Sequence, residues 1–409
     1  MTVHFKQDKP DESNRLDDMR QGVIGKALPR VEGLAKVTGT ATYAAEYSID
    51  NCAEGVLVTS TITRGEVTSI DRDAALAMPG VIAVIDDPRL TTRAAQGTAD
   101  EAPQQKPKTV CYWGQPIALV VAETFEQARD ATKHLAIEYR VEEGAPLDPN
   151  TVEPEEQEDE TVHQGDLAHA MSEATHSVDV TYTTRGHASA AMEPHAAIAQ
   201  WDGDKLTVYA SLQMLNYNIS ELADALDMEE GDIRLVSRFV GGGFGSKLGI
   251  SEEAVAASIA AKELGRPVRV VMSRQQVFQC IMRRSETTQR LRLCTDANGT
   301  LTGFGHEALV SNLPGEEFAE PVLQSSHFLY GGENRELMLK VARIHRMTAG
   351  SVRAPGEAVG MPALEAAMDV LAEEVGIDPV ELRLRNIPEK NPEEGLPFSS
   401  HKLAECLKQ

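Results

Sequence analysis

The pattern of apolar and polar residues in the first third of the chain predicts strands that alternate with short helices. Apolar and polar residues alternate in 56–62, as in a half-buried strand, and 81–85 is a second apolar run. A third run, 117–121, leads to Thr124, and Gln127 follows at the spacing of a reciprocally capped helix start. Two β-α-β passages of this kind predict one small α/β domain.

The pattern beyond residue 165 predicts a larger, mixed domain. Asp296 and Gly299 bound the turn signal DANG, which favours a hairpin between two alternating runs. Asp378, Pro379 and Glu381 have the spacing of a helix N-terminus. The predicted strands are 177–184, 195–200, 205–210, 233–240, 268–272, 288–294 and 301–310, and the predicted helices are 218–226, 252–264 and 362–375. The fold class that follows is α+β.

These elements divide the chain into segments. Residues 1–24 are polar and are expected to form a flexible leader. Residues 25–148 are expected to form the small N-terminal α/β domain, which begins with an extended arm rich in glycine and threonine. Residues 149–164 include the acidic run EPEEQEDE, which predicts a solvated linker, and 165–409 are expected to form the larger domain.

Charge and cysteine content exclude several classes of protein. The net charge is −24, which disfavours nucleic acid and anionic membranes as partners. No apolar run approaches the roughly 20 residues of a membrane span. The five cysteines are scattered without a C-x-x-C motif, so the sequence indicates neither a zinc or iron–sulfur site nor a disulfide framework. The amino terminus lacks an apolar signal region, which favours a cytoplasmic location, or a periplasmic one if a partner chain carries an export signal.

The segment 239–247, FVGGGFGSK, lies between a β-branched run and an alanine-rich helical pattern. Its glycines allow positive φ and close contact with a ligand, as in a cofactor cradle. It departs from a Walker loop because no Ser or Thr follows Lys247, and from a dinucleotide fingerprint because Ser246 takes the third glycine position. From these residues alone, a cofactor cradle and a bend for close packing both stay open.

The loop is similar to the G-G-G-F-G-x-K loop of the molybdenum-binding subunit of the xanthine dehydrogenase and aldehyde oxidase family. Further segments resemble motifs of this family and occur in its order: the arm 25–43, GQPIALVV at 114–121, MEPH at 192–195, SLQ at 211–213, RAPGE at 353–357 and DPVELRLRN at 378–386. Together they cover nearly the whole chain from residue 25. The segment LPGEE, 313–317, most resembles bacterial three-subunit aldehyde oxidoreductases.

The resemblance implies a hammerhead-like small domain followed by the first molybdopterin-binding domain, incomplete at its C-terminal end. It implies a molybdenum–molybdopterin cofactor, in bacteria often the cytosine dinucleotide form, and hydroxylation of an aldehyde or of an N-heterocycle such as xanthine. Electrons are expected to pass to a [2Fe-2S] subunit and a FAD subunit. The general-base glutamate is expected in a missing C-terminal half, so this chain alone is expected to be inactive.

Carried over by motif, the resemblance also assigns roles to single residues. Gln213 would place its amide near a molybdenum oxo group, and Arg353 would orient the substrate or stabilise developing negative charge. The backbone would lie against the cofactor at Gly242, Gly243, Phe244 and Gly245. No protein side chain is expected to bind the metal directly. Each residue also has a purely structural alternative: Gln213 as a turn amide, Phe244 as a core anchor and Arg353 as the partner of a carboxylate.

Other residues near these motifs have different expected roles. Glu193 and His195 share a face of a predicted strand, but two ligands are too few for a metal site, so a structural hydrogen-bonding role is expected. Lys247 is expected to contact either the cofactor or a carboxylate. Glu357 belongs to RAPGE and is not taken as the general base. Leu212 stands where the family has threonine, which places a hydroxyl contact in question.

Two functions follow from the sequence. The first is the N-terminal half of a molybdenum hydroxylase subunit, with a small aldehyde or heterocycle as substrate. The alternative is a non-catalytic truncated remnant or assembly module of the same complex. A nucleotide-binding enzyme of the P-loop type is disfavoured by the absent G-K-[ST].

Overall fold

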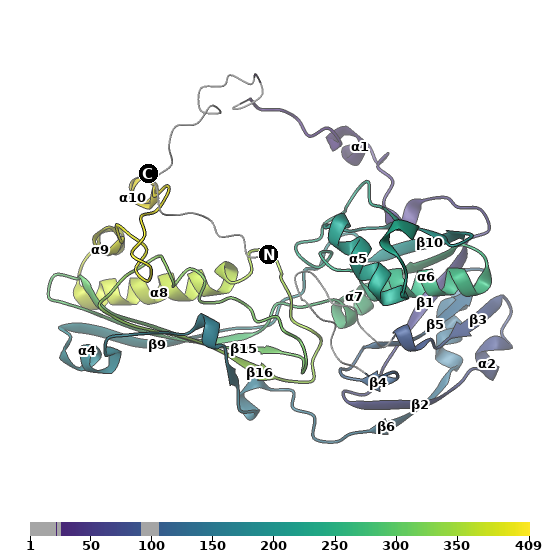
Figure 1. The fold of residues 1–409 in the computed structure, drawn as a ribbon, viewed down its shortest axis with the longest axis horizontal. Coiled ribbons are helices and arrows are strands. Elements are labelled where there is room, and N and C mark those ends of the chain that lie inside the picture. Colours follow the sequence, from purple (N-terminus) through teal and green to yellow (C-terminus); the bar gives the residue numbers. More distant parts are fainter. Residues whose placement is uncertain (1–21, 23–25, 91–105) are drawn as a thin grey trace.

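The computed structural model describes residues 22, 26–90 and 106–409. The predicted leader, 1–24, therefore lies outside the described residues apart from Gly22. The described chain builds two large sheets that lie side by side, with helices packed on both (Figure 1). No helix in the described residues has the length and apolar character that crossing a membrane requires.

A 7-stranded sheet, ordered β12-β11-β10-β13-β1-β5-β3, unites both predicted domains. The strand β1 in its interior pairs antiparallel with β5 and parallel with β13. The strands are β1 Ala53–Thr59, β3 Val81–Ile85, β5 Pro116–Ala122, β10 Ala196–Asp202, β11 Lys205–Ala210, β12 Ile233–Val236 and β13 Val268–Val271. Because β1, β3 and β5 precede residue 148 and the others follow it, the two regions share one backbone hydrogen-bond network.

Both faces of this sheet are covered. The helices α5 (Leu215–Leu226) and α6 (Glu252–Leu264) contribute to one apolar core, in which alanines at the α6 interface let the helix approach the strands closely. The alternation of β1 sends Leu57 into that core and its neighbours Val56 and Val58 into a second core. This second core includes α3 (Phe125–Ala131), whose predicted capping box between Thr124 and Gln127 is confirmed. The small sheet β4-β2-β6 and a short helix complete it: β2 Gly65–Asp71, α2 Asp73–Leu76, β4 Thr109–Val110 and β6 Ala136–Val141.

The 6-stranded sheet is built around the predicted hairpin, which is confirmed as an antiparallel pair of β14 and β15. The strand β16 then pairs parallel with β15. Helix α8 (Glu357–Val375) lies along one face and shares its apolar core with these strands (Figure 1). The strands are β7 Glu155–Glu156, β8 Val162–Gln164, β9 His176–Thr184, β14 Thr287–Thr295, β15 Leu301–Asn312 and β16 Asn334–Arg343.

The remaining helices are α1 Gly33–Val37, α4 Leu167–Glu173, α7 Arg274–Cys280, α9 Pro379–Asn386 and α10 Leu403–Lys408. Helix α1 stands apart from both sheets, and none of its residues is buried (Figure 1). The start of α9 is as the sequence predicts: the Asp378 carboxylate accepts hydrogen bonds from the backbone N–H groups of Val380 and Glu381.

The sequence did not predict β2, α7 or β16, and three further segments differ from the prediction. The arm is not extended throughout, because it contains α1 and a short 3-10 helix, Ala44–Glu46. The predicted strand 233–240 ends at Val236, so the glycine-rich loop leaves the sheet earlier than expected. Helix α8 begins at Glu357 rather than at Pro362, because the distant Glu320 carboxylate accepts the backbone N–H of Gly356 at its start.

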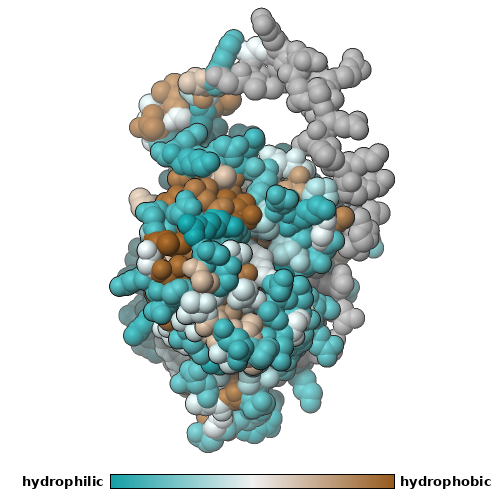
Figure 2. Space-filling view, turned by 90° about the vertical axis from the view of Figure 1, so that its left-hand side faces the viewer, coloured by the Kyte–Doolittle hydropathy of each residue, from teal (hydrophilic) through white to brown (hydrophobic). Residues whose placement is uncertain are grey.

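The acidic segment 149–164 stays largely exposed but joins a sheet edge. Strands β7 and β8 both pair antiparallel with β16. The face of the molecule that carries α4, α8 and α9 is mostly hydrophilic, with hydrophobic side chains gathered in its upper half (Figure 2). A charged, hydrated surface of this kind agrees with the net charge of −24.

Acid is expected to destabilise the fold through His306 on β15. The ring is fully buried, its Nε2–H donates to Gln289 Oε1 at 3.2 Å, and Nδ1 accepts from the Ser326 hydroxyl at 2.8 Å. Burial lowers the pKa of His306 to about 3, from its ordinary value of 6.5. Between those two values the unfolded chain binds the additional proton, so the free energy of unfolding falls as pH falls, by up to ~1.4 kcal/mol per pH unit.

We therefore expect His306→Gln to flatten the dependence of the unfolding midpoint on pH between about pH 6 and pH 4. Urea unfolding at a series of pH values measures it, with the exposed His169→Gln as the matched control. An unchanged slope in His306→Gln would show that this ring does not carry the effect.

Candidate functional site

The glycine-rich loop 239–247 has a backbone that few side chains tolerate. Gly242 and Gly245 have φ values of +103° and +101°, and Phe244 between them has φ +55°. The backbone conformation is unfavourable at Phe244, because a residue with a Cβ rarely adopts the left-handed region. Its ring is 45% exposed, so it projects at the surface and is not a core anchor.

The glycines also allow very close packing against two other segments. A Cβ on Gly243 would lie 2.1 Å from Gln213 Oε1, and a Cβ on Gly245 would lie 1.8 Å from the carbonyl oxygen of Ser351. The Gly245 contact is between backbone groups and leaves no room for a side chain, whereas the Gly243 contact is with the amide end of the Gln213 side chain.

Gln213, just beyond β11, is fixed by its amide oxygen. Oε1 accepts the backbone N–H of Gly245 at 3.1 Å and that of Lys247 at 3.3 Å, while the Gln213 N–H donates to Lys247 O at 2.8 Å. Its side-chain NH₂ has no partner in the described residues. The amide oxygen of Gln213 is therefore occupied by the loop, whereas its NH₂ group is available to donate to a ligand.

A buried ion pair holds the base of the loop. Lys247 Nζ, fully buried, donates to Glu193 Oε2 at 2.9 Å, to Glu193 O at 3.1 Å and to Ser211 Oγ at 3.0 Å, which uses all three ammonium protons. Glu193 Oε2 also accepts the Ser211 hydroxyl at 2.5 Å and the Gly241 N–H at 2.7 Å. Lys247 thus contacts a carboxylate, the second of its two expected partners.

The ionisation of this pair follows from its donors. Burial alone would raise the pKa of Glu193, but the hydrogen bonds from Ser211, Lys247 and Gly241 lower that pKa below its ordinary value. Burial lowers the pKa of Lys247, and the Glu193 carboxylate opposes that shift. Glu193 therefore acts as a structural acceptor, as the sequence predicts.

His195 has a structural role as well. Its buried ring donates from Nε2 to Ser246 O at 2.9 Å, and burial lowers its pKa to about 4, which keeps the ring neutral. Nδ1 has no hydrogen-bond partner in the described part of the chain. Across residues 22, 26–90 and 106–409, His, Cys, Asp and Glu side chains form no group of three that could hold a metal ion.

Arg353 reaches the loop from the other side. Its backbone N–H donates to Phe244 O at 2.8 Å, next to the contact between Gly245 and Ser351. The Arg353 side chain is exposed, and its guanidinium makes no hydrogen bond or ion pair with the described residues. The structure thus brings Gln213, the loop and the backbone of Arg353 together, and no carboxylate among the described residues pairs with Arg353.

The loop also presents backbone donors. The N–H groups of Gly242, Gly243 and Phe244 have no acceptor among the described residues. Three consecutive free donors beside the Gln213 side chain, with the exposed Arg353 on the adjoining segment, suit a ligand rich in oxygen acceptors.

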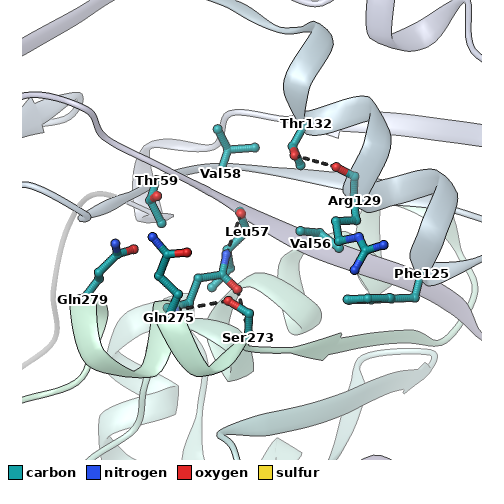
Figure 3. Close-up of a pocket in the computed structure, with 11 residues that line it drawn as sticks. Val56, Leu57, Val58, Thr59, Phe125, Arg129, Thr132, Ser273, Gln275 and Gln279 are labelled. Atoms are coloured by element: carbon teal, nitrogen blue, oxygen red, sulfur yellow. Dashed lines mark hydrogen bonds between the residues drawn. The ribbon is translucent and has the colours of Figure 1, made fainter. Parts of the chain in front are cut away.

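A pocket of about 320 Å³ lies apart from these residues, between β1, α3 and α7 (Figure 3). Its lining includes Gln275, Gln279 and Thr59, with Arg129 beside Phe125. Neither Gln213, the loop nor Arg353 lines it.

Sequence reasoning missed the role of Ser211. This residue is buried, bonds both members of the Lys247–Glu193 pair and lies two positions before Gln213. The available signal was its place at the end of a predicted strand, where alternate residues share a face.

Comparison with known proteins agrees with this geometry. The family described as the molybdopterin cofactor-binding domain matches residues 149–387, and the a/b hammerhead domain of aldehyde oxidase and xanthine dehydrogenase matches 38–143. The chain is 40% identical to the aldehyde oxidoreductase molybdenum-binding subunit PaoC of Escherichia coli (strain K12), over 99% of this chain and 56% of that protein. It is 28% identical to the xanthine dehydrogenase molybdenum-binding subunit of Escherichia coli O157:H7, over 93% of this chain and 54% of that protein.

Solved structures give the same result. The aldehyde oxidoreductase from Desulfovibrio gigas superposes with a TM-score of 0.82 at 25% identity, covering 93% of this chain and 45% of that one. Quinoline 2-oxidoreductase from Pseudomonas putida 86 shares the fold, with a TM-score of 0.84 at 20% identity, over 94% of this chain and 53% of that one. The chain spans about half the length of these relatives. The predicted fold, a hammerhead-like domain followed by molybdopterin-binding structure, is confirmed, and the chain belongs to the molybdenum-binding subunits of the aldehyde oxidase and xanthine dehydrogenase family.

Proposed function

We propose that this chain forms one side of the active site of a molybdenum hydroxylase that oxidises aldehydes or N-heterocycles such as xanthine. The observation that carries the proposal is the set of unused donors on adjoining segments: the Gln213 amide NH₂, the loop N–H groups and the Arg353 guanidinium. The 40% identity to an aldehyde oxidoreductase subunit supports an aldehyde as the substrate class.

The residues fit a molybdenum–molybdopterin group, for which we propose the cytosine dinucleotide form. Gly243 and Gly245 let the loop pack against Gln213 and Ser351, and the free N–H groups of 242–244 match oxygen acceptors on such a group. The bound cofactor would supply the oxygen-transfer and two-electron chemistry. We propose that Gly242, Gly243, Phe244, Gly245 and Gln213 hold it, with no metal ligand from the protein.

This chain's own contribution to the reaction would be positioning and electrostatics. Gln213, with its oxygen fixed by Gly245 and Lys247, would donate its NH₂ towards an oxo group at the metal. Arg353 would orient the substrate or stabilise the negative charge that develops on it. The exposed ring of Phe244 would form an apolar wall beside them.

The remaining parts would come from partners. Electrons would pass to an iron–sulfur subunit with a [2Fe-2S] centre and then to a FAD subunit. The general-base glutamate would lie in a C-terminal half of the subunit, and residues 1–409 without that half would be inactive. The assembly would be cytoplasmic, or periplasmic if a partner carries an export signal. The alternative proposal is a non-catalytic remnant or assembly module of the same complex.

Co-expression with a second half of the subunit from a relative is expected to yield a complex that contains molybdenum, measured by elemental analysis. The two halves together would enclose the group that the loop binds on one side. A folded, co-purified complex without molybdenum would contradict the hydroxylase and favour the assembly module.

In such a complex, Gln213→Ala and Arg353→Ala are each expected to lower kcat/KM by about 10² or more, as for the loss of a preorganised donor to developing charge. Steady-state kinetics with an aromatic aldehyde measures this effect. Gln275→Ala, which changes an amide in the separate pocket of Figure 3, is the matched control. Equal activity in Gln213→Ala and Gln275→Ala would contradict the proposed role of Gln213.

Lys247→Met is expected to destabilise the chain by about 3–5 kcal/mol, because it leaves the Glu193 carboxylate buried without a counter-charge. Lys133→Met removes an exposed pair with Asp130 and is expected to cost no more than about 1 kcal/mol. Urea unfolding of both variants gives the comparison. Equal losses would show that the buried pair is not what holds the loop base.

A further inference from the structure

A second buried ion pair lies behind the turn that carries Arg353. Arg284, which follows α7, donates from Nη1 to Glu320 Oε1 at 2.6 Å. The side chains are 3% and 0% exposed. Glu320 lies in the connection between β15 and β16, so the pair joins two segments that are distant in sequence.

The guanidinium of Arg284 binds consecutive carbonyl groups of the turn. Nη2 donates to Val352 O at 3.0 Å and also to Arg353 O, and Nη1 donates to Ala354 O at 3.3 Å. Glu320 Oε1 accepts the Gly356 N–H at 2.7 Å. Between them, the two side chains bind the carbonyl groups of 352–354 and the N–H group of Gly356.

The turn needs such support because its backbone is unfavourable by itself. Ala354 has φ +54°, and Gly356, which precedes α8, has φ +80°. Gly356 has no side chain that could cap the helix, and the Glu320 carboxylate does so instead. Backbone of this kind persists only where surrounding contacts fix it, and here Arg284 and Glu320 provide them.

The same turn is joined to the glycine-rich loop. The Arg353 N–H donates to Phe244 O at 2.8 Å, and Gly245 packs against Ser351 O. Neighbouring charges are already engaged, since Glu286 pairs with Arg283 and Arg346. Arg284 is therefore a buried cation that binds the turn from the protein interior, whereas Arg353 is a cation of the turn that is exposed.

We propose that Arg284 and Glu320 are positioning residues that fix the direction of the Arg353 side chain relative to Gln213 and the loop. This proposal rests on the proposed function, in which Arg353 contacts the substrate. Arg284 acts through its planar fork, which a lysine cannot reproduce although it carries the same charge. The pair therefore sets geometry at the site while touching neither cofactor nor substrate.

The first test is amide hydrogen exchange on the 409-residue chain. Arg284→Lys keeps the charge opposite Glu320 but loses the fork, so exchange in 352–358 is expected to rise by about tenfold, the factor for one charge-assisted hydrogen bond. Exchange in β14 and β15 is expected to stay slow. Arg290→Lys on β14, which alters an exposed pair with Asp179 on β9, is the matched control and is expected to change exchange in neither region.

Two outcomes of the exchange experiment would overturn the proposal. Unchanged exchange in 352–358 would mean that the fork does not hold the turn. A uniform rise across β14, β15 and α8 would mean that the pair stabilises the whole sheet and has no specific effect on the turn. Glu320→Gln gives a second reading, because it keeps the side-chain shape and removes the counter-charge of Arg284.

The second test is a double-mutant cycle on the assembled enzyme. If Arg284 acts through Arg353, then Arg284→Lys lowers kcat/KM, and the double variant with Arg353→Ala is no slower than Arg353→Ala alone. If the fold losses in kcat/KM of the two single variants multiply in the double variant, the proposal is overturned. If Arg353→Ala alone leaves turnover unchanged, the proposed function of Arg353 fails, while the exchange experiment still decides whether Arg284 holds the turn.

Discussion

The buried pair of Lys247 and Glu193 is the interaction on which the site depends. A fully buried ammonium is unfavourable unless each proton is bonded, and here Glu193 and Ser211 accept all three. The same carboxylate oxygen accepts the Gly241 N–H, so one network fixes where the glycine-rich loop starts and where it ends. Between these fixed points the backbone can hold positive φ at positions that would otherwise relax.

The site is made by two loops that support each other. The glycine-rich loop packs against Gln213 on one side and against the Ser351–Arg353 segment on the other. A Cβ atom on Gly243 would clash with the first, and one on Gly245 would clash with the second. The Gln213 side chain makes the first contact through its amide oxygen, and backbone groups make the second. The exposed groups that result, an amide NH₂, backbone N–H groups and a guanidinium, are all donors.

The large sheets place these loops. The strands β10 to β13 carry the segments of Glu193, Gln213 and the glycine-rich loop, whereas the turn of Arg353 leads into α8 on the other sheet. Strands from before residue 148 extend the first sheet through the pairing of β1 with β13. A ligand at the loop would therefore lie between the segments carried by the 7-stranded sheet and the turn that leads into α8 on the 6-stranded sheet.

The sequence by itself determined the elements with local signals. The capping box at Thr124, the DANG hairpin and the N-terminus of α9 at Asp378 all form as expected, because neighbouring residues satisfy each other there. The glycine-rich loop and Gln213 could be located by motif, although their contact could not. Only the tertiary structure decided the early start of α8, the Lys247 partner and the support of Arg353. Each of these depends on a side chain distant in sequence, namely Glu320, Glu193 and Arg284. Local residue patterns do not show which distant side chains come into contact.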